Sequence, residues 1–339
     1  MSVETENMNL TAPTFTTATI TPAQAAVTEP SRTSRALLVA LMSAASFGAA
    51  GPFGKMLFAA GWSPVAAVTM RIGVAALVLA VPTVLELRGR WHLLRSNARV
   101  IALYSLFGVA GTQLFYFIAI EHLSVGVALL LEYLSPTLLV LLAWVTTRRA
   151  PSRLTTLGAV TALLGLVLVL NVFGAITIST IGVVFGLGAA VCSATFFLVA
   201  SEEPEDGLSP VALSGVGMAL GVIPLTLLGV TGVLPMTATL DSVPFGDAQV
   251  SVFVPIIGLS LISAAFAYVA GVNAARMLGS RVASFLALSE VLFAVLFAWL
   301  FVGELPLPIQ LAGGGLIVLG VVLVRSGEQG EQDKAQLTD

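Results

Sequence analysis

Long apolar runs separated by short polar breaks constrain the fold of this chain more than any other feature. Mean hydropathy is +1.00, and only 10% of the 339 residues are charged. A soluble α/β fold would need many more charged side chains to cover its surface. Because a helix needs about 20 apolar residues to cross a bilayer, the pattern predicts an all-α membrane protein with many spans.

Hydropathy read in windows of about 19 residues separates ten runs, each near the length of one membrane crossing. The ten predicted spans are 36–60, 64–86, 99–120, 123–146, 154–172, 181–201, 209–231, 251–275, 280–302 and 307–325.

The basic residues gather in alternate breaks between these spans. If the N-terminus is cytoplasmic, the opposite side of the membrane holds almost no cations, so the positive-inside rule predicts that both termini are cytoplasmic. This favours a multi-pass protein of the cytoplasmic membrane. The cations on that side are Arg88, Arg90, Arg95, Arg99, Arg148, Arg149, Arg153, Arg276, Arg281, Arg325 and Lys334.

The chain repeats itself at a fixed offset. The segment from Ala119 aligns without gaps on the segment from Ala274, and the same offset carries Gly158 onto Gly313. Upstream, "GWSPVA" from Gly61 matches "GLSPVA" further along the chain. Five helices in each half make equivalent helices cross in opposite senses, so the sequence predicts two inverted five-helix repeats, an arrangement typical of secondary transporters.

These boundaries divide the chain into five parts. Two expected tails, a disordered cytoplasmic one at the N-terminus and a cytoplasmic one at the C-terminus, flank the two repeats, which an external linker joins. The parts are 1–35 (N-terminal tail), 36–172 (first repeat), 173–180 (linker), 181–325 (second repeat) and 326–339 (C-terminal tail).

Several kinds of chemistry have no support in the sequence. Cys192 is the one cysteine and lies in an apolar run, which favours a packing role. His92 and His122 lie at polar edges. We therefore expect no metal or other cofactor. A net charge of −3 gives no sign of nucleic-acid binding, and no P-loop pattern indicates ATP as an energy source.

Glu132 is an acidic residue close to the middle of a predicted span. A lipid-facing carboxylate at that depth would cost several kcal/mol, so we expect it to face the protein interior. Pro136 removes the amide that would bond the carbonyl of Glu132 and predicts a helix break beside it.

Glu290 is the acidic residue in the corresponding helix of the second repeat. It aligns with Ser135, three residues from Glu132, which is nearly one helical turn. Two carboxylates facing one cavity would repel each other, which favours binding of a proton and predicts protons as a coupling ion.

Arg71 lies at a depth comparable to Glu132 and has two interpretations. It could hold a substrate carboxylate while Glu132 or Glu290 binds the substrate ammonium, as an amino acid would require. Alternatively, Arg71 and Glu132 could form a structural ion pair.

Four further residues are weaker candidates. Tyr133, Tyr116 and Gln113 could line the cavity, although aromatic residues also serve for packing. Lys55 is expected to be a gate or snorkelling residue near the outer end of the first span. The stretch from Thr231 to Ser251 could cover the outer mouth or serve as a linker.

The run "GPFGKMLFAAGWSPVAAVTMRIGVAAL" from Gly51 resembles the first two helices of EamA-type transporters of the drug/metabolite transporter superfamily. "FVGELPLPIQLAGGGLIVLGVVLV" is similar to that family's Gly-Glu turn and last helix, with Glu304 in the turn. "GVALLLEYLSPTLLVLL" followed by "RRAP" is most like the branch of bacterial threonine and homoserine exporters. The first repeat lacks the Gly-Glu turn and has "TTRRAP" instead.

The resemblance implies a secondary transporter that exports a small polar metabolite through a central cavity with alternating access. An amino acid is the candidate substrate, and proton antiport the candidate energy source. An intramembrane enzyme, or a structural or receptor-like membrane protein, is the alternative. Against the enzyme, the sequence contains no histidine inside a predicted span, no metal-ligand cluster and no nucleophile motif.

Overall fold

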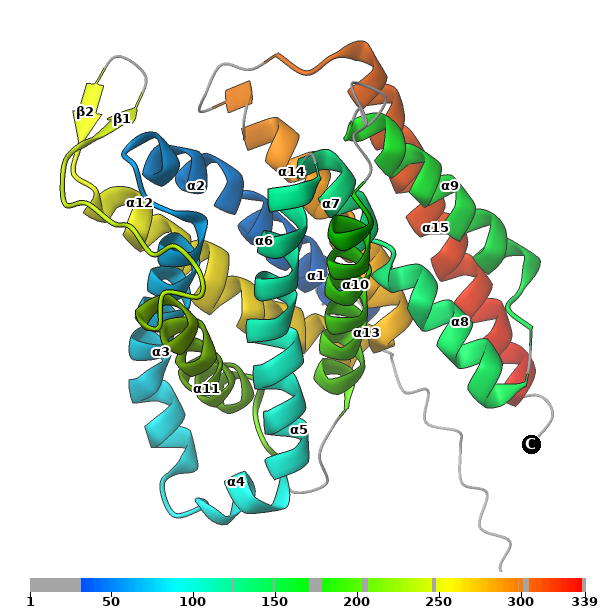
Figure 1. Ribbon diagram of the computed structural model, residues 1–339. Helices are drawn as coiled ribbons and strands as arrows, with labels where there is room; N and C mark the ends of the chain where they lie inside the picture. Colours follow the sequence, from blue (N-terminus) through cyan, green and yellow to red (C-terminus); the bar gives the residue numbers. More distant parts are fainter. Residues whose placement is uncertain are drawn as a thin grey trace, which may run out of the picture.

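A computed structural model describes residues 32–123, 125–148, 150–170, 179–202, 207–245, 248–297, 299–300 and 305–336. The described part is almost entirely helical (Figure 1). The expected N-terminal tail 1–35 and linker 173–180 lie mostly outside these residues, as does Glu304.

The first half contains α-helices and one π-helix, η1. In chain order they are α1 (Arg32–Gly48), α2 (Ala50–Ala59), α3 (Pro64–Leu87), α4 (His92–Ser96), α5 (Ala98–Leu103), η1 (Tyr104–Gly111), α6 (Thr112–His122), α7 (Val125–Glu132), α8 (Ser135–Thr147) and α9 (Arg153–Val169).

The second half contains a second π-helix, η2, and a short antiparallel hairpin. Its elements are α10 (Thr180–Ser201), α11 (Pro210–Val230), β1 (Val243–Phe245), β2 (Ala248–Val250), α12 (Phe253–Ile257), η2 (Gly258–Phe266), α13 (Ala267–Ala287), α14 (Ser289–Phe297) and α15 (Pro308–Gln336). The hairpin was not expected of an all-α chain.

Eight helical stretches within the described residues are long and apolar enough to cross a membrane. One of them, Phe253–Ala287, is 35 residues long and contains a break at Gly279, whose φ of 78° is not helical. α9 is apolar but has only 17 residues. The eight stretches are Thr33–Ala59, Pro64–Leu87, Ala98–Ile120, Val127–Thr147, Thr180–Ser201, Pro210–Val230, Phe253–Ala287 and Pro308–Glu328.

The two repeated "SPVA" segments have the same local structure. Ser63 caps α3 by accepting a hydrogen bond from the Ala66 amide, and Ser209 caps α11 in the same way. In both cases the following proline occupies the first helical turn, where no amide donor is needed. The repeated sequence therefore starts an equivalent helix in each half.

Two pairs of equivalent helices pack against each other and run antiparallel. In the α3–α11 pair, Thr83 donates to the Val211 carbonyl, while Gly73, a little under three turns earlier, lies against Val222. In the α9–α15 pair, Gly158 lies opposite Gly320 and Gly165 opposite Gly313. Opposite directions of equivalent helices are the relationship that an inverted repeat predicts.

Glycine lets α9 and α15 approach closely. A Cβ added at Gly158 would lie 2.6 Å from the Val324 amide nitrogen, and one added at Gly313 would lie 2.6 Å from the Gly165 carbonyl oxygen. Small residues of this kind stabilise helix pairs in lipid, where close backbone packing replaces the hydrophobic effect. In Figure 1 this pair lies at one side of the molecule, next to α8.

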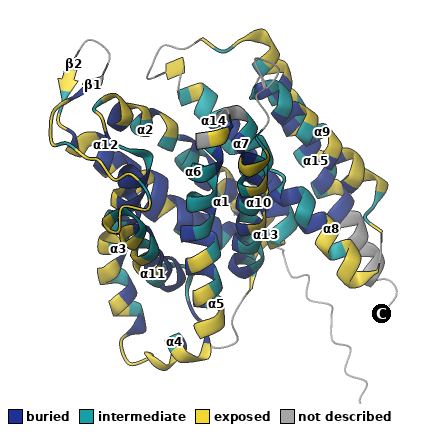
Figure 2. Cartoon of the chain, in the orientation of Figure 1, coloured by how far each residue is buried: buried dark blue, intermediate teal, exposed yellow. Residues whose placement is uncertain are grey.

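The outward faces of the helices are apolar and exposed, as expected for contact with lipid. On α3, for example, Leu77, Val81 and Leu85 are each more than 60% exposed. Figure 2 shows the buried residues on the inner faces of the helices, with exposed residues around them. The core contains small and apolar residues from both halves, among them Ile72, Val109, Leu213 and Val272.

The last helix extends into the segment predicted as the C-terminal tail. α15 continues to Gln336, eleven residues beyond the predicted end of the last span at 325. The segment contains good helix formers such as Glu, Gln, Lys and Ala, and no proline interrupts it. Glu328, inside this extension, is buried and makes an ion pair with Arg281.

Candidate functional site

A cavity of about 850 Å³ lies between the two halves. It is lined by parts of α1, α2, α3, η1, α6, α7, α8, α9, α10, η2, α13, α14 and α15. Seven of the eight residues singled out from the sequence line it, namely Lys55, Arg71, Gln113, Tyr116, Glu132, Tyr133 and Glu290. Pro136, the eighth, is buried behind the lining.

A helix break brings Glu132 to the cavity. α7 ends at Glu132, and α8 begins at Ser135 with Pro136 in its first turn. The break predicted from Pro136 is therefore present. The break leaves a backbone carbonyl beside the carboxylate without its helical donor. Within a membrane, such irregular backbone is tolerated only where it lines a cavity or is buried in protein.

A second break brings Glu290 to the same cavity. Leu288 separates α13 from α14, and Glu290 lies in the first turn of α14. Tyr133 from the first break lies beside the Glu290 side chain. The two broken helices thus place one carboxylate from each half in a common space.

Gly48 at the end of α1 packs against this second break. A Cβ at position 48 would lie 2.8 Å from the Glu290 carbonyl oxygen and 2.9 Å from the Ala294 amide nitrogen. The contact requires glycine because a methyl group would displace the first turn of α14. Gly48 therefore determines where Glu290 lies in the cavity.

The equivalent contact in the first half joins two hydroxyl groups that sequence reasoning missed. Ser193 of α10 donates to the Ser135 hydroxyl oxygen at 3.1 Å, and both residues line the cavity. Ser135 is the repeat partner of Glu290, so the alignment held the signal for it. For Ser193 the sequence offered no such signal, since serine is common in apolar helices.

Arg71 of α3 is only 7% exposed, and its guanidinium is held by the second half. Nη2 donates to the backbone carbonyl of Ser263 in η2, and the guanidinium carbon lies 5.9 Å from the centre of the Phe47 ring. Nε is buried and has no hydrogen-bond partner among the described residues.

In this conformation Arg71 makes no ion pair with Glu132 among the described residues. Within the described chain, no Glu132 or Glu290 oxygen approaches an Arg71 nitrogen within 4.0 Å. Arg71 bonds instead to the carbonyl of Ser263, which lies in a π-helix, where the regular carbonyl-to-amide bonding of an α-helix is altered. Arg71 and the two glutamates are thus present in one cavity without neutralising each other directly.

The π-helices occupy equivalent places in the two halves. η1 starts at Tyr104 and η2 at Gly258, close to the repeat offset. In η1 the carbonyl of Phe107 accepts a hydrogen bond from the Thr112 hydroxyl at 3.0 Å, five residues later. Thr112 also lines the cavity. Sequence periodicity gave no indication of either π-helix.

Lys55 and Phe58 of α2 line the cavity where it reaches the surface, since both are exposed. In Figure 1 α2 lies near the hairpin, on the side away from α4. Within the part of the chain that the structure describes, the stretch from Thr231 to Ser251 does not line the cavity. It is bound instead to the α2–α3 loop, where the Trp62 indole donates to the Thr239 carbonyl at 2.8 Å.

Aromatic rings close the deeper part of the cavity. Tyr268 packs edge-on against Phe47 at 5.1 Å and against Phe196 at 5.7 Å between ring centroids. Tyr104 lies 5.6 Å from Phe196 and is fully buried. The two Tyr268 pairs have the geometry of stabilising edge-to-face contacts, whereas the Tyr104 ring is tilted by 38° against Phe196. Phe47, Phe196 and Tyr268 of this cluster line the cavity.

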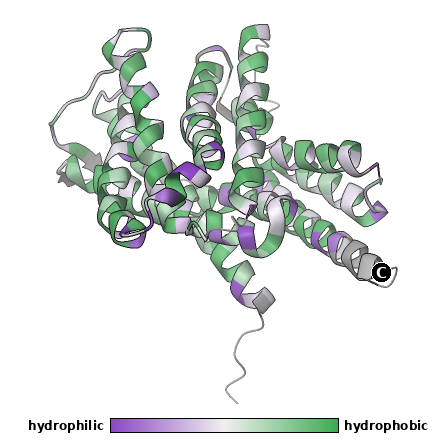
Figure 3. Cartoon of the chain, turned by 90° about the horizontal axis from the view of Figure 1, so that it is seen from below, coloured by the Kyte–Doolittle hydropathy of each residue, from purple (hydrophilic) through white to green (hydrophobic). Residues whose placement is uncertain are grey.

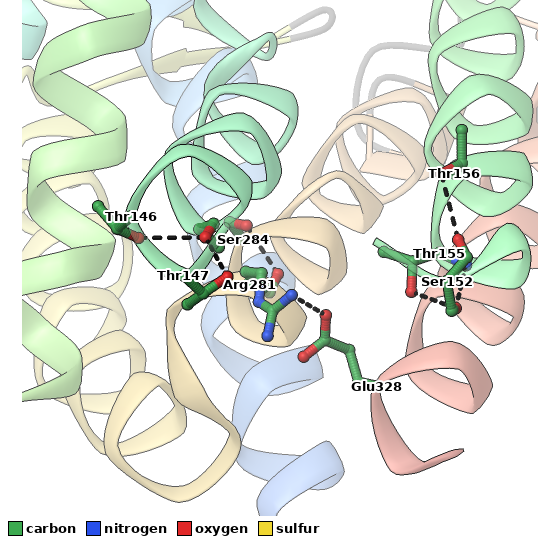
Figure 4. Close-up of polar contacts among 9 residues, drawn as sticks. Thr146, Thr147, Ser152, Thr155, Thr156, Arg281, Ser284 and Glu328 are labelled. Carbon is green, nitrogen blue, oxygen red and sulfur yellow. Dashed lines mark hydrogen bonds and ion pairs between the residues drawn. The ribbon is translucent and has the colours of Figure 1, made fainter. Parts of the chain in front are cut away.

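A polar cluster lies where α8, α13 and α15 come together (Figure 4). Arg281 of α13 makes an ion pair of 2.8 Å with Glu328 of α15, and the Ser284 hydroxyl donates to the Arg281 carbonyl. On α9, the Ser152 hydroxyl caps the helix by accepting from the Thr155 amide at 3.1 Å. The Arg281–Glu328 ion pair ties α13 to α15.

The described residues contain no group of three or more metal-ligating side chains. Cys192 is buried and free, and a Cβ at Gly111 would lie 3.0 Å from its sulfur, so it packs between helices as expected. His92 and His122 are both exposed, and neither lines the cavity.

Comparisons with known proteins agree with this architecture. One solved crystal structure of a protein has the same fold, with a TM-score of 0.68 at 16% sequence identity, covering 86% of this chain and 98% of the other. No functionally curated protein matches the chain in sequence. The EamA-like transporter family matches twice, over residues 34–171 and 180–326. The chain is therefore a multi-pass membrane transporter rather than an enzyme, and it belongs to the EamA-like transporter family.

Proposed function

We propose that this protein is a secondary active transporter that exports a zwitterionic metabolite, an amino acid with an apolar side chain, in exchange for protons. The observation that carries the proposal is the lining of one cavity by Arg71, Glu132 and Glu290 with no ion pair between the arginine and either acid. Such a site can bind both charges of an amino acid.

Arg71 would bind the substrate carboxylate. Its guanidinium is held at one nitrogen by the Ser263 carbonyl, while Nε has no partner within the described residues. Arginine binds carboxylates through two parallel hydrogen bonds. A buried cation with an unused donor is stabilised when an anion enters, because desolvation without compensation is costly.

Glu132 or Glu290 would bind the substrate ammonium or a proton. Two ionised carboxylates in one small cavity repel each other, and either an ammonium group or a proton relieves that repulsion. Competition between the two cations would couple substrate export to proton entry. The membrane potential contributes about 2.3 kcal/mol per charge per 100 mV.

The walls between these charged groups favour an apolar side chain on the substrate. Aromatic and aliphatic residues supply most of the lining, among them Phe47, Phe58, Phe117, Leu129 and Val295. The resemblance to the threonine and homoserine exporter branch also supports an amino-acid substrate. The cavity volume of about 850 Å³ exceeds the volume of a single amino acid and leaves room for water.

Ten membrane crossings fit the described helices best. Dividing Phe253–Ala287 at Gly279, joining its short second part to α14, and adding α9 increases the eight long apolar stretches to ten. Leu37, near the start of α1, and Val321, near the middle of α15, pack against the same cluster. The arginine distribution supports cytoplasmic positions for both termini in the cytoplasmic membrane. The cavity would then be open to the outside.

Transport by purified protein in liposomes tests the proposal. An imposed pH gradient should drive uptake of labelled apolar amino acids, and E132Q and E290Q should each reduce the gradient-driven rate at least tenfold. D241N is a matched control, because Asp241 is an exposed acid of the loop near the hairpin. If both Gln variants respond to the pH gradient like the unmodified protein, proton coupling through these acids is wrong.

A further inference from the structure

The segment between α3 and α5 carries a concentrated positive charge. Arg88 and Arg90 follow α3, Arg95 ends α4, and Arg99 begins α5, and all four side chains are exposed. Trp91 lies among them and is 53% exposed. In Figure 1 α4 lies at the end of the molecule opposite the hairpin, and Figure 3 views the molecule from that side.

The local structure presents these side chains on a fixed support. Leu93 of α4 is only 2% exposed and packs into the main core. The Asn97 side-chain amide donates to the Leu93 carbonyl at 3.0 Å. Arg90 is oriented by bonds from Nε and Nη2 to the Glu86 carbonyl, at 3.2 and 2.8 Å. The arginines therefore project from an ordered turn.

None of the four arginines is paired with a carboxylate of the described chain. The nearby acid Glu86 accepts a hydrogen bond from the Ser209 hydroxyl of α11 and makes no ion pair with them. Arg281, on the same side, differs in this respect, because it makes an ion pair with Glu328.

The depth of this surface matches the phosphate layer of a bilayer. α3 has 24 residues, or about 36 Å at 1.5 Å per residue, against about 30 Å of hydrocarbon. Its last turn and α4 therefore reach the headgroups. Tryptophan is enriched at this depth, where one part of the ring contacts acyl chains and another contacts water.

We propose that Arg88, Arg90, Arg95, Arg99 and Trp91 form a binding surface for anionic phospholipid headgroups. Clustered basic residues beside a membrane helix attract such lipids by about 1 kcal/mol each. Guanidinium groups bind phosphate oxygens through paired hydrogen bonds. The proposal rests on α3 and α5 crossing the membrane and is independent of what the cavity transports.

The chain offers a matched pair of variants for the test. R90Q/R95Q removes two exposed arginines of the surface. R148Q/R153Q removes two exposed arginines with the same separation in sequence, from the connection between α8 and α9. Arg148 and Arg153 have no exposed tryptophan between them. Both double variants lower the net charge equally.

Purified full-length protein, freed of lipid in detergent, would be titrated with dioleoylphosphatidylglycerol, and bound lipid would be counted by native mass spectrometry. We expect R90Q/R95Q to weaken the tightest phosphatidylglycerol binding about tenfold, and R148Q/R153Q less than twofold. Phosphatidylcholine binding should not change. R88Q/R99Q should reproduce the loss, which guards against a folding defect in the first variant.

Equal losses in the two matched variants would overturn the proposal, because they would show a general effect of charge. Unchanged binding in both R90Q/R95Q and R88Q/R99Q would also overturn it. Displacement of the lipid by millimolar inorganic phosphate would assign the surface to free phosphate instead. Persistence of the bound lipid against phosphate, together with a selective loss in the surface variants, is the supporting result.

Discussion

Arg281 of α13 and Glu328 of α15 form an ion pair, with 2.8 Å between Nη1 and Oε1. Glu328 is 7% exposed, so its charge depends on this partner. Removing one member of a buried pair leaves the other charge uncompensated. We expect R281Q and E328Q each to destabilise the fold by on the order of 2 kcal/mol.

Thermal unfolding in detergent would measure this change as a lower apparent Tm. The exchanged variant R281E/E328R should regain most of the lost stability if the pair itself matters. Unchanged melting in both single variants would show that solvent compensates these charges.

The close approach of α9 and α15 predicts that alanine substitutions at two glycines of α15 change the stability of the protein differently. At Gly320 a Cβ would lie 2.6 Å from the Gly158 carbonyl oxygen, whereas at Gly315 nothing lies within 4 Å. We expect G320A to destabilise the protein by roughly 2 kcal/mol through overpacking. G315A should be neutral or slightly stabilising, since alanine favours helix by about 1 kcal/mol over glycine. Apparent Tm values in detergent would compare the two, and equal values would contradict the close packing.

Gly48 and Gly51 provide a similar comparison for function. A Cβ at Gly48 would meet the first turn of α14, whereas one at Gly51 meets nothing within 4 Å. We expect G48A to displace Glu290 and to reduce transport in liposomes at least tenfold while G51A retains it. Retained transport in G48A would mean that the position of Glu290 is not critical.

Arg71 should not be replaceable by lysine. A lysine ammonium can bond the Ser263 carbonyl or a substrate carboxylate, but it lacks the planar arrangement of donors that allows arginine to do both. We expect R71K to raise the KM for amino acids about tenfold or more. K55R is the control, because Lys55 lies at the exposed end of the cavity.

Competition experiments would identify the group that Arg71 binds. Amines that lack a carboxylate should inhibit the R71K variant and the unmodified protein equally, because they do not use the arginine. A larger effect of R71K on these amines would assign Arg71 a role in the structure of the site rather than in carboxylate binding.

Much of this architecture was predictable because lipid imposes simple rules on the sequence. Apolar runs near the thickness of a bilayer gave the helices, and the offset that relates Gly158 to Gly313 gave the repeat. Glu132 and Pro136 are costly in hydrocarbon, which directed both to a protein interior. α15 extends into the predicted C-terminal tail, where polar helix formers continue the helix.

The sequence by itself determined which segments are apolar enough to enter the membrane and which charged residues must face inward, because lipid penalises an exposed carboxylate or guanidinium near the middle of a span. Only the tertiary structure decided the partners of those charges. Arg71 donates a hydrogen bond to the carbonyl of Ser263 and not to Glu132. Ser263 lies in a π-helix, which the sequence periodicity does not predict. Such contacts depend on distances between helices from different halves, which a one-dimensional pattern does not contain.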